Sequence, residues 1–190
     1  LIFSSLQRLQ GAETLKIDVA GIDRERIMKA AALAMKLEPV TITTFPAKLS
    51  EGGINDFYSN GDYWWPNPKK PNGLPYIKKD GETNPENFGK HRLTLKALRD
   101  GVAALAAAYK LTGDERYVTK ATELLKVFFL DAKTRMNPNL QYAQAIPGVS
   151  PGRGIGIIDA LHLIEIPLAV KTLENSKSFP KESGAELRLW

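Results

Sequence analysis

The clearest alternation of apolar and polar positions in the chain lies after Lys90. Apolar side chains recur there every three or four residues, at Leu95, Leu98, Val102, Leu105 and Tyr109. This spacing places them on one face of an amphipathic helix. The pattern therefore predicts a long helix whose apolar face packs against a core.

A second helix is predicted directly after the first. Gly113 and Asp114 separate the two, and glycine is favoured just after a helix whereas aspartate is favoured at a helix N-cap. The second apolar stripe runs to near Asp131 and consists of Tyr117, Ala121, Leu124, Leu125 and Phe128. Two helices joined by so short a turn must lie antiparallel.

Three further helices are predicted from capping residues and prolines. One runs from about Asp23, a favourable N-cap, to Glu38, where Pro39 ends it. Another starts at Ile157 and is kinked by Pro167, and a last one begins near Pro180. In the helix that starts at Ile157, the residues expected to face inward are Ile158, Leu161, Ile164 and Leu168.

Two long irregular segments separate the helices. Residues 39–90 are rich in proline, glycine and aromatic side chains, and residues 136–156 are rich in amides and glycine. Loops of this length inside a domain usually bind something, and the aromatic content argues against disorder. Helical hairpins linked by such loops predict an all-α fold, namely an (α/α) toroid built from antiparallel helical hairpins.

The ends of the chain suggest its domain organisation. We expect residues 1–22 to form an N-terminal segment, either the remnant of an export signal with a linker or the boundary of a fragment. The helical pattern from Glu182 to Trp190 stops without a capping glycine or a proline. We therefore expect residues 23–190 to be the N-terminal part of a toroid domain that continues beyond Trp190.

Composition narrows the chemistry. The 190 residues include 43% hydrophobic and 25% charged side chains, as in one globular domain, and no cysteine. The absence of cysteine excludes disulfides, cysteine-ligated metals and thiol nucleophiles. The net charge of +5 favours an anionic partner, but no nucleic-acid-binding motif and no apolar run long enough to span a membrane occurs. The sequence does not indicate an oligomeric state.

Adjacent tryptophans mark the first irregular segment as a candidate sugar-binding loop. Trp64 and Trp65 follow Tyr63, and neighbouring side chains on an extended backbone point to opposite faces. One indole can then anchor the loop while the other presents its ring to the apolar face of a sugar. The alternative is that both indoles only fix the loop to the helices. These three aromatic residues are predicted substrate contacts.

The second irregular segment favours an anionic ligand. Five hydrogen-bonding side chains fall within eight residues: Asn137, Asn139, Gln141, Tyr142 and Gln144. Arg153 follows between two glycines, and no acid occurs between Asp131 and Asp159. Arginine can bind a carboxylate or sulfate in bidentate fashion, so Asn139, Tyr142, Gln144 and Arg153 are predicted contacts. The alternative is that the amides cap turns and Arg153 is solvated.

The remaining polar candidates are histidines and loop carboxylates. His91, where the aromatic loop meets its helix, is a predicted contact, whereas His162 within a helix favours a packing role. Neither a zinc motif nor a metal site is predicted. A glycoside hydrolase would need two paired acids, for which Asp56, Asp62 and Asp80 are the loop candidates, although turn or surface roles are more typical of each.

Four segments between about residues 55 and 165 form a more specific pattern than any single motif. They are Gly-Asp-Tyr-Trp-Trp-Pro-Asn-Pro from Gly61, Gly-Leu-Pro-Tyr-Ile from Gly73 with Asp80-Gly and Asn84-Pro, Met-Asn-Pro-Asn-Leu-Gln-Tyr-Ala-Gln-Ala-Ile-Pro-Gly from Met136, and Gly-Arg-Gly-Ile-Gly-Ile-Ile from Gly152. Together they resemble the alginate lyase domain of α/α-toroid polysaccharide lyases.

The resemblance implies β-elimination on an anionic polyuronate such as alginate. In that reaction the C6 carboxylate is neutralised, a Tyr or His base removes the C5 proton, and a Tyr commonly protonates the departing O4. No cofactor or metal is implied. The Asn-His pair, Arg and Tyr that such lyases use are expected beyond Trp190. The catalytic residues are therefore unknown here, and the isolated chain is expected to have little activity.

The residues that resemble the substrate-binding part of such lyases are Tyr63, Trp64, Trp65, His91, Asn139, Tyr142, Gln144 and Arg153. Two other functions stay open, a glycoside hydrolase of uronides on the same toroid and a non-catalytic carbohydrate-binding protein. The expected partner is an acidic polysaccharide. Because such polymers lie outside the cytoplasm, we expect a periplasmic or secreted protein.

Overall fold

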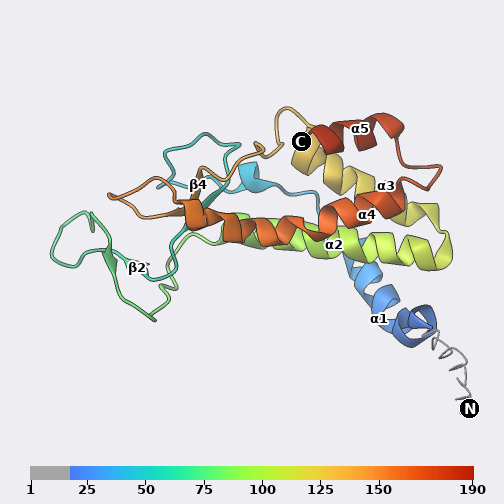
Figure 1. Ribbon diagram of the computed structural model, residues 1–190, viewed down its shortest axis with the longest axis horizontal. Coiled ribbons are helices and arrows are strands. Elements are labelled where there is room, and N and C mark those ends of the chain that lie inside the picture. The colour runs from blue at the N-terminus through green and yellow to red at the C-terminus, as the bar shows by residue number, and fades with distance from the viewer. Residues whose placement is uncertain (1–17) are drawn as a thin grey trace, which may run out of the picture.

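The computed structural model describes residues 18–190, and about half of them are helical (Figure 1). The five α-helices in this part of the chain are α1 (Val19–Ala34), α2 (Lys90–Thr112), α3 (Glu115–Leu125), α4 (Glu165–Leu173) and α5 (Lys181–Leu189). The fold is thus mainly helical, as predicted, and four short strands accompany the helices. None of the helices in residues 18–190 combines the length and the apolarity needed to cross a membrane.

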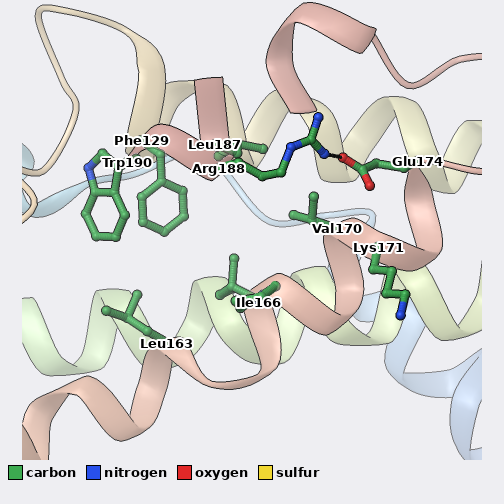
Figure 2. Close-up of a pocket in the computed structure, with 10 residues that line it drawn as sticks. Phe129, Leu163, Ile166, Val170, Lys171, Glu174, Leu187, Arg188 and Trp190 are labelled. Atoms are coloured by element: carbon green, nitrogen blue, oxygen red, sulfur yellow. Dashed lines mark hydrogen bonds and ion pairs between the residues drawn. The ribbon is translucent and has the colours of Figure 1, made fainter. Parts of the chain in front are cut away.

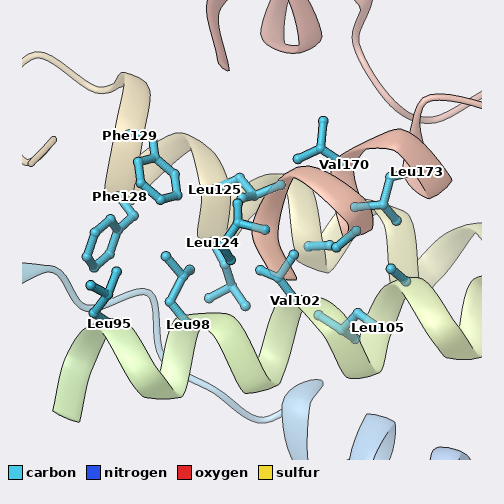
Figure 3. Packing of buried hydrophobic residues seen from close by; sticks show 14 of the residues in the cluster. Leu95, Leu98, Val102, Leu105, Leu124, Leu125, Phe128, Phe129, Val170 and Leu173 are labelled. Carbon is cyan, nitrogen blue, oxygen red and sulfur yellow. The ribbon is translucent and has the colours of Figure 1, made fainter. Parts of the chain in front are cut away.

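The long helix α2 is the centre of the fold, because α1, α3 and α4 all pack against it. Its apolar face is the one predicted from the sequence: Leu95, Val102 and Leu105 are fully buried. Figure 3 shows this face meeting side chains from α3, the following turn and α4. These partners are Leu124, Leu125, Phe128, Phe129, Val170 and Leu173.

The predicted antiparallel hairpin of α2 and α3 is confirmed. Gly113 ends α2 with φ of 70°, a left-handed conformation that glycine adopts without steric cost, and its N–H donates to Tyr109 O. The Asp114 side chain accepts from the N–H of Arg116 and caps α3. A π-helical turn, η2 (Lys126–Leu130), continues α3 almost to Asp131, where the helix was predicted to end.

The first helix lies about four residues earlier than predicted. Asp18, not Asp23, is its N-cap, and its carboxylate accepts from Gly21 N at 2.9 Å. Asp23 instead forms an ion pair with Arg26 one turn later. The proposed boundary at residue 22 therefore falls inside α1. The rest of the predicted N-terminal segment, residues 1–17, lies outside the described residues.

The helix predicted from Ile157 is the largest correction. The chain first forms a 3₁₀ helix, η3 (Gly154–Leu163), and only then α4. The four residues expected to face inward are 43–64% exposed: Ile158, Leu161, Ile164 and Leu168. The buried face of α4 is Ile166, Ala169, Val170 and Leu173. The shift arises because a 3₁₀ helix has about three residues per turn, so a spacing based on 3.6 loses phase along it.

Short strands bring the two irregular segments together at the N-terminal end of α2 (Figure 1). Strand β1 (Tyr58–Asn60) pairs in parallel with β4 (Tyr142–Ala145). Strands β2 (Trp64–Trp65) and β3 (Ile77–Lys78) form an antiparallel hairpin that projects from the body. A 3₁₀ turn, η1 (Ile42–Thr44), packs on α2. The aromatic and amide-rich segments thus become neighbours.

Two glycines allow η3 to lie directly against β4 and the turn before it. A Cβ on Gly152 would overlap the carbonyl oxygen of Gln141, and a Cβ on Gly156 would lie 2.7 Å from Ala143 Cβ. Gly154, between them, has no such neighbour within 4 Å. Close backbone approach therefore requires the outer two glycines, whereas the middle one is sterically free.

We expect Gly152→Ala to lower the free energy of unfolding by about 3 kcal/mol, because the backbone of residue 141 would have to move. Gly154→Ala is the matched control and should change it by less than about 1 kcal/mol. Urea titrations monitored by tryptophan fluorescence measure both. Equal effects of the two substitutions would contradict this account of the close approach.

Candidate functional site

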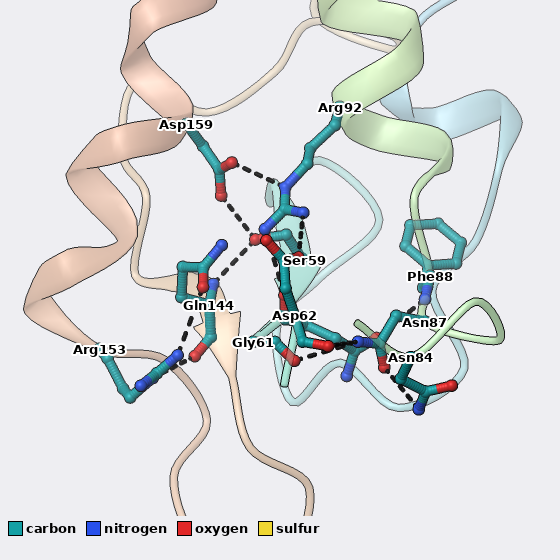
Figure 4. A network of polar contacts seen from close by, with 11 residues as sticks. Ser59, Gly61, Asp62, Asn84, Asn87, Phe88, Arg92, Gln144, Arg153 and Asp159 are labelled. Carbon is teal, nitrogen blue, oxygen red and sulfur yellow. Dashed lines mark hydrogen bonds and ion pairs between the residues drawn. The ribbon is translucent and has the colours of Figure 1, made fainter. Parts of the chain in front are cut away.

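A single arginine at the start of α2 ties the irregular segments to the helices. Arg92 Nε donates to Asp159 Oδ1 at 2.7 Å, and Nη1 donates to Asp62 Oδ1 at 2.7 Å. Nη2 donates to the carbonyl oxygen of Asn60 at 3.1 Å. Figure 4 shows how this guanidinium connects α2, η3, β1 and the loop after β1.

A buried serine extends the network to β4. Ser59 Oγ donates to Asp159 Oδ2 at 2.6 Å and accepts from the backbone N–H of Gln144 at 2.8 Å. Gln144 is 4% exposed and has φ of 55°, a left-handed conformation that is uncommon outside glycine. Such strain is typical of functional sites, where surrounding contacts hold the backbone in place.

The carbonyl oxygen and Oε1 of Gln144 both face the Arg153 guanidinium. Arg153 Nε donates to the first at 2.7 Å and Nη2 to the second at 3.3 Å. No carboxylate of residues 18–190 lies within ion-pair distance of Arg153. The side chain lines a shallow hollow of about 360 Å³. An oriented cation without a counter-charge, at the edge of a hollow, is suited to bind an anion.

The two adjacent tryptophans, Trp64 and Trp65, have different roles. Gly61 lies so close to Arg153 and Trp64 that a Cβ there would be 2.6 Å from Arg153 Nη2 and 2.7 Å from Trp64 Cδ1. The half-buried indole of Trp64 therefore lies near the Arg153 guanidinium. Trp65 Nε1 donates to the carbonyl oxygen of Glu82 at 2.9 Å and so holds the projecting hairpin.

Amide side chains fix the backbone that carries these aromatic residues. Asn84 Nδ2 donates to the carbonyl oxygen of Trp64 at 3.0 Å, and Asn87 Nδ2 donates to that of Gly61 at 3.0 Å. The neighbouring side chain, Tyr63, is 43% exposed. The loop thus presents Tyr63 and Trp64 from a backbone held at several points.

Two predicted contacts lie elsewhere. Asn139 Oδ1 accepts from the N–H of Gln141 at 3.1 Å and caps a turn, as the alternative interpretation stated. The Tyr142 ring packs against Gly52, where a Cβ would lie 2.5 Å from ring carbons. The observed contacts therefore connect Trp64, Gln144 and Arg153 from the predicted set, whereas those of the Asn139 and Tyr142 side chains are with other residues.

His91 is buried inside the fold instead of facing a ligand. It is 2% exposed, its Nδ1 accepts from the N–H of Tyr58 at 2.9 Å, and its Nε2 lies 2.9 Å from the carbonyl oxygen of Phe45. Since Nδ1 accepts, the ring proton is on Nε2 and donates to Phe45. Burial lowers the pKa of His91, so the ring is neutral at pH 7. The predicted contact is corrected to a structural histidine.

Two other side chains that could exchange protons, Tyr58 and His162, differ in how far they are buried. Burial raises the pKa of Tyr58 to about 12, and this tyrosine is 1% exposed, so it is unsuited to act as a base at neutral pH. His162 lies one 3₁₀ turn after Asp159, and its Nδ1 accepts from Arg99 Nη1 at 3.0 Å. Partial burial and then the charge of Arg99 lower the pKa of His162.

The loop carboxylates do not form a catalytic pair. Asp62 pairs with Arg92, and Asp80 pairs with Lys78 on the projecting hairpin. Asp56 accepts from Asn137 Nδ2 at 2.7 Å. Within residues 18–190 no three His, Cys, Asp or Glu side chains come together as a set of metal ligands.

Three residues of the network, Ser59, Arg92 and Asp159, were not among the predicted contacts. Asp159 did carry a recognisable pattern, because it is the only charged residue in the apolar run from Ile155 to Ile164. A lone acid in such a run is usually buried with a partner. Ser59 and Arg92 carry no comparable pattern, because their roles depend on contacts with residues far away in sequence.

Comparisons with known proteins agree on one family. The family model for alginate lyase matches residues 42–190. The crystal structure of an alginate lyase from Bacteroides ovatus is 41% identical in sequence with a TM-score of 0.79, over 87% of this chain and 44% of that one. This chain therefore spans less than half the length of that protein. A search of curated proteins finds no match.

The Arg92 network leads to a stability prediction. Arg92→Met would leave Asp159, whose side chain is 5% exposed, without its ionic partner, and we expect a loss of about 3 kcal/mol in the free energy of unfolding. Asp62→Asn is the control, because the Asp62 side chain is 44% exposed and its ion pair should contribute at most about 1 kcal/mol. Urea denaturation at pH 7 measures both, and similar losses would contradict the central role of the Arg92–Asp159 pair.

A second prediction concerns pH. Because burial in the folded protein lowers the pKa of His91 below its ordinary value of 6.5, the unfolded chain takes up a proton first as the pH falls. The stability that His91 provides is thus complete above that value and is lost on acidification. His91→Asn places a non-titrating acceptor near Nδ1, so its unfolding free energy should fall less than that of the wild type between about pH 7.5 and pH 5. Parallel curves would assign the loss to other groups, since His162 titrates in both proteins.

Proposed function

The chain belongs to the alginate lyase family, and we propose that it provides the substrate-binding part of a lyase that cleaves an acidic, alginate-like polysaccharide by β-elimination. The family match and the 41% identical alginate lyase support the reaction class. The guanidinium of Arg153 has no acidic partner in residues 18–190 and lies beside Trp64 and a hollow. This is the observation that supports a uronate-containing substrate.

The chemistry of β-elimination explains why this guanidinium matters. Removal of the C5 proton becomes feasible when the neighbouring carboxylate is neutralised, because negative charge then develops next to a cation. Arg153 offers two parallel N–H groups in a fixed plane, a geometry that matches a carboxylate. The Trp64 ring can pack on the apolar face of the same sugar. We assign Arg153 and Trp64 to binding and no residue to proton transfer.

The proposed enzyme is an (α/α) toroid in which these loops line one end. The antiparallel α2–α3 hairpin, followed by α4 and α5, supports this architecture. We propose that the loops at the N-terminal end of α2 form part of the substrate cleft. Since polyuronates lie outside the cytoplasm, we also propose that the enzyme acts in the periplasm or outside the cell.

The reaction class is tested by its product. β-Elimination creates a double bond conjugated with the uronate carboxylate, which absorbs in the ultraviolet, whereas hydrolysis of a saturated chain does not. Incubation with alginate, followed by absorbance and by reducing-end measurement, separates the two. Because this chain is proposed to supply substrate binding alone, the assay uses a longer form of the protein. Reducing ends without the chromophore would indicate a hydrolase, and binding without either product by that longer form would indicate a carbohydrate-binding protein.

Arg153→Ala should weaken binding of an alginate pentamer by roughly 10-fold or more and that of a neutral mannan pentamer far less, because the lost interaction is ionic. Added salt should narrow the difference, since it screens an exposed charge. Arg24→Ala on α1, an exposed arginine far along the chain, removes the same charge and serves as control. Isothermal titration calorimetry measures the affinities, and equal losses on both ligands would remove Arg153 from the site.

A further inference from the structure

The side chain that holds Arg153 is a neutral amide, although a carboxylate would hold it more tightly. Arg153 Nη2 donates to Gln144 Oε1 at 3.3 Å, and Nε donates to the carbonyl oxygen of the same residue at 2.7 Å. A carboxylate at this position would add the Coulombic attraction of an opposite charge to these hydrogen bonds. It would also cancel the positive charge, so the guanidinium would no longer attract an anion.

The other half of the Gln144 amide has no partner. Within residues 18–190, Nε2 is buried and makes no hydrogen bond, whereas most buried polar atoms in proteins are paired. Gln144 is also the only non-glycine residue of this part of the chain with a positive φ, at 55°. A buried, strained residue with an unpaired donor contributes little to stability, so its conformation needs another explanation.

The contacts that Gln144 makes in this left-handed conformation supply that explanation. Its N–H donates to Ser59 Oγ, so residue 144 is held by the network of Asp159 and Arg92. In this conformation both its carbonyl oxygen and its Oε1 face the same guanidinium (Figure 4). The buried network thereby fixes the direction of Arg153 through a residue that carries no charge.

We propose that Gln144 is a positioning residue whose neutrality gives the site its preference for acidic over neutral saccharides. It orients the Arg153 guanidinium through two uncharged acceptors and leaves the positive charge for the carboxylate of the substrate. This inference rests on the proposed function, because it presupposes that Arg153 binds a uronate.

The decisive variant is Gln144→Glu. It keeps Oε1 and replaces only Nε2, which has no partner, so no hydrogen bond is lost and the change is one of charge. We expect the affinity for an alginate pentamer to fall at least about 10-fold and its salt dependence to weaken, while the affinity for a neutral mannan pentamer stays unchanged. In an Arg153→Ala background the same substitution should have no further effect on alginate binding, since it acts through that guanidinium.

Gln144→Met is the matched neutral variant, and it also answers the question if Gln144→Glu fails to fold. It removes Oε1 but adds no charge, and the carbonyl oxygen of residue 144 still accepts from Arg153 Nε, so the salt-dependent preference for alginate should persist within about 3-fold. Thermal unfolding of every variant is measured beside calorimetric titration of both pentamers.

The results separate the two levels of the hypothesis. If the wild type does not bind alginate, the proposed function itself is rejected, and this inference with it. If the wild type binds but Gln144→Glu binds equally well, or Gln144→Met loses the preference, only the role of Gln144 is overturned. A Gln144→Glu effect that persists without Arg153 would likewise overturn it.

Discussion

The site depends on the buried ion pair between Arg92 and Asp159. With its side chain 5% exposed, Asp159 requires a cationic partner, because an isolated charge in a protein interior is very unfavourable. Arg92 meets that requirement from α2, and its remaining N–H groups reach β1 and Asp62. One guanidinium thus determines where the core helix, the aromatic loop and η3 lie relative to each other.

A series of hydrogen bonds connects this buried ion pair to the protein surface. Asp159 accepts from Ser59, Ser59 accepts from Gln144, and Gln144 accepts from Arg153. The buried end of the chain of contacts is charged and paired, its middle is neutral, and its outer end is a cation that has no acidic partner in residues 18–190. Such an arrangement orients a binding group before the ligand arrives, so less conformational entropy is lost on binding.

The sequence predicted those parts of the fold that follow from local periodicity and capping. The α2–α3 hairpin agrees with prediction because one apolar stripe, Gly113 and Asp114 all act within a few residues. The helix from Ile157 differs because it begins as a 3₁₀ helix that packs against β4, where Gly156 lies close to Ala143. Those contacts are tertiary, so they cannot be predicted from the spacing of apolar residues.

The same distinction explains which site residues could be found from sequence. The type of a polar residue does not show whether its side chain binds a ligand or forms hydrogen bonds with the main chain. The His91 and Asn139 side chains both form hydrogen bonds with main-chain groups. Arg153 differs because a guanidinium has more donors than its two neutral acceptors use and a charge that they do not compensate. The absence of acids between Asp131 and Asp159 already indicated this surplus. Uncompensated charge in a long polar loop is therefore the reason for proposing Arg153, and not the other polar residues, as a binding residue.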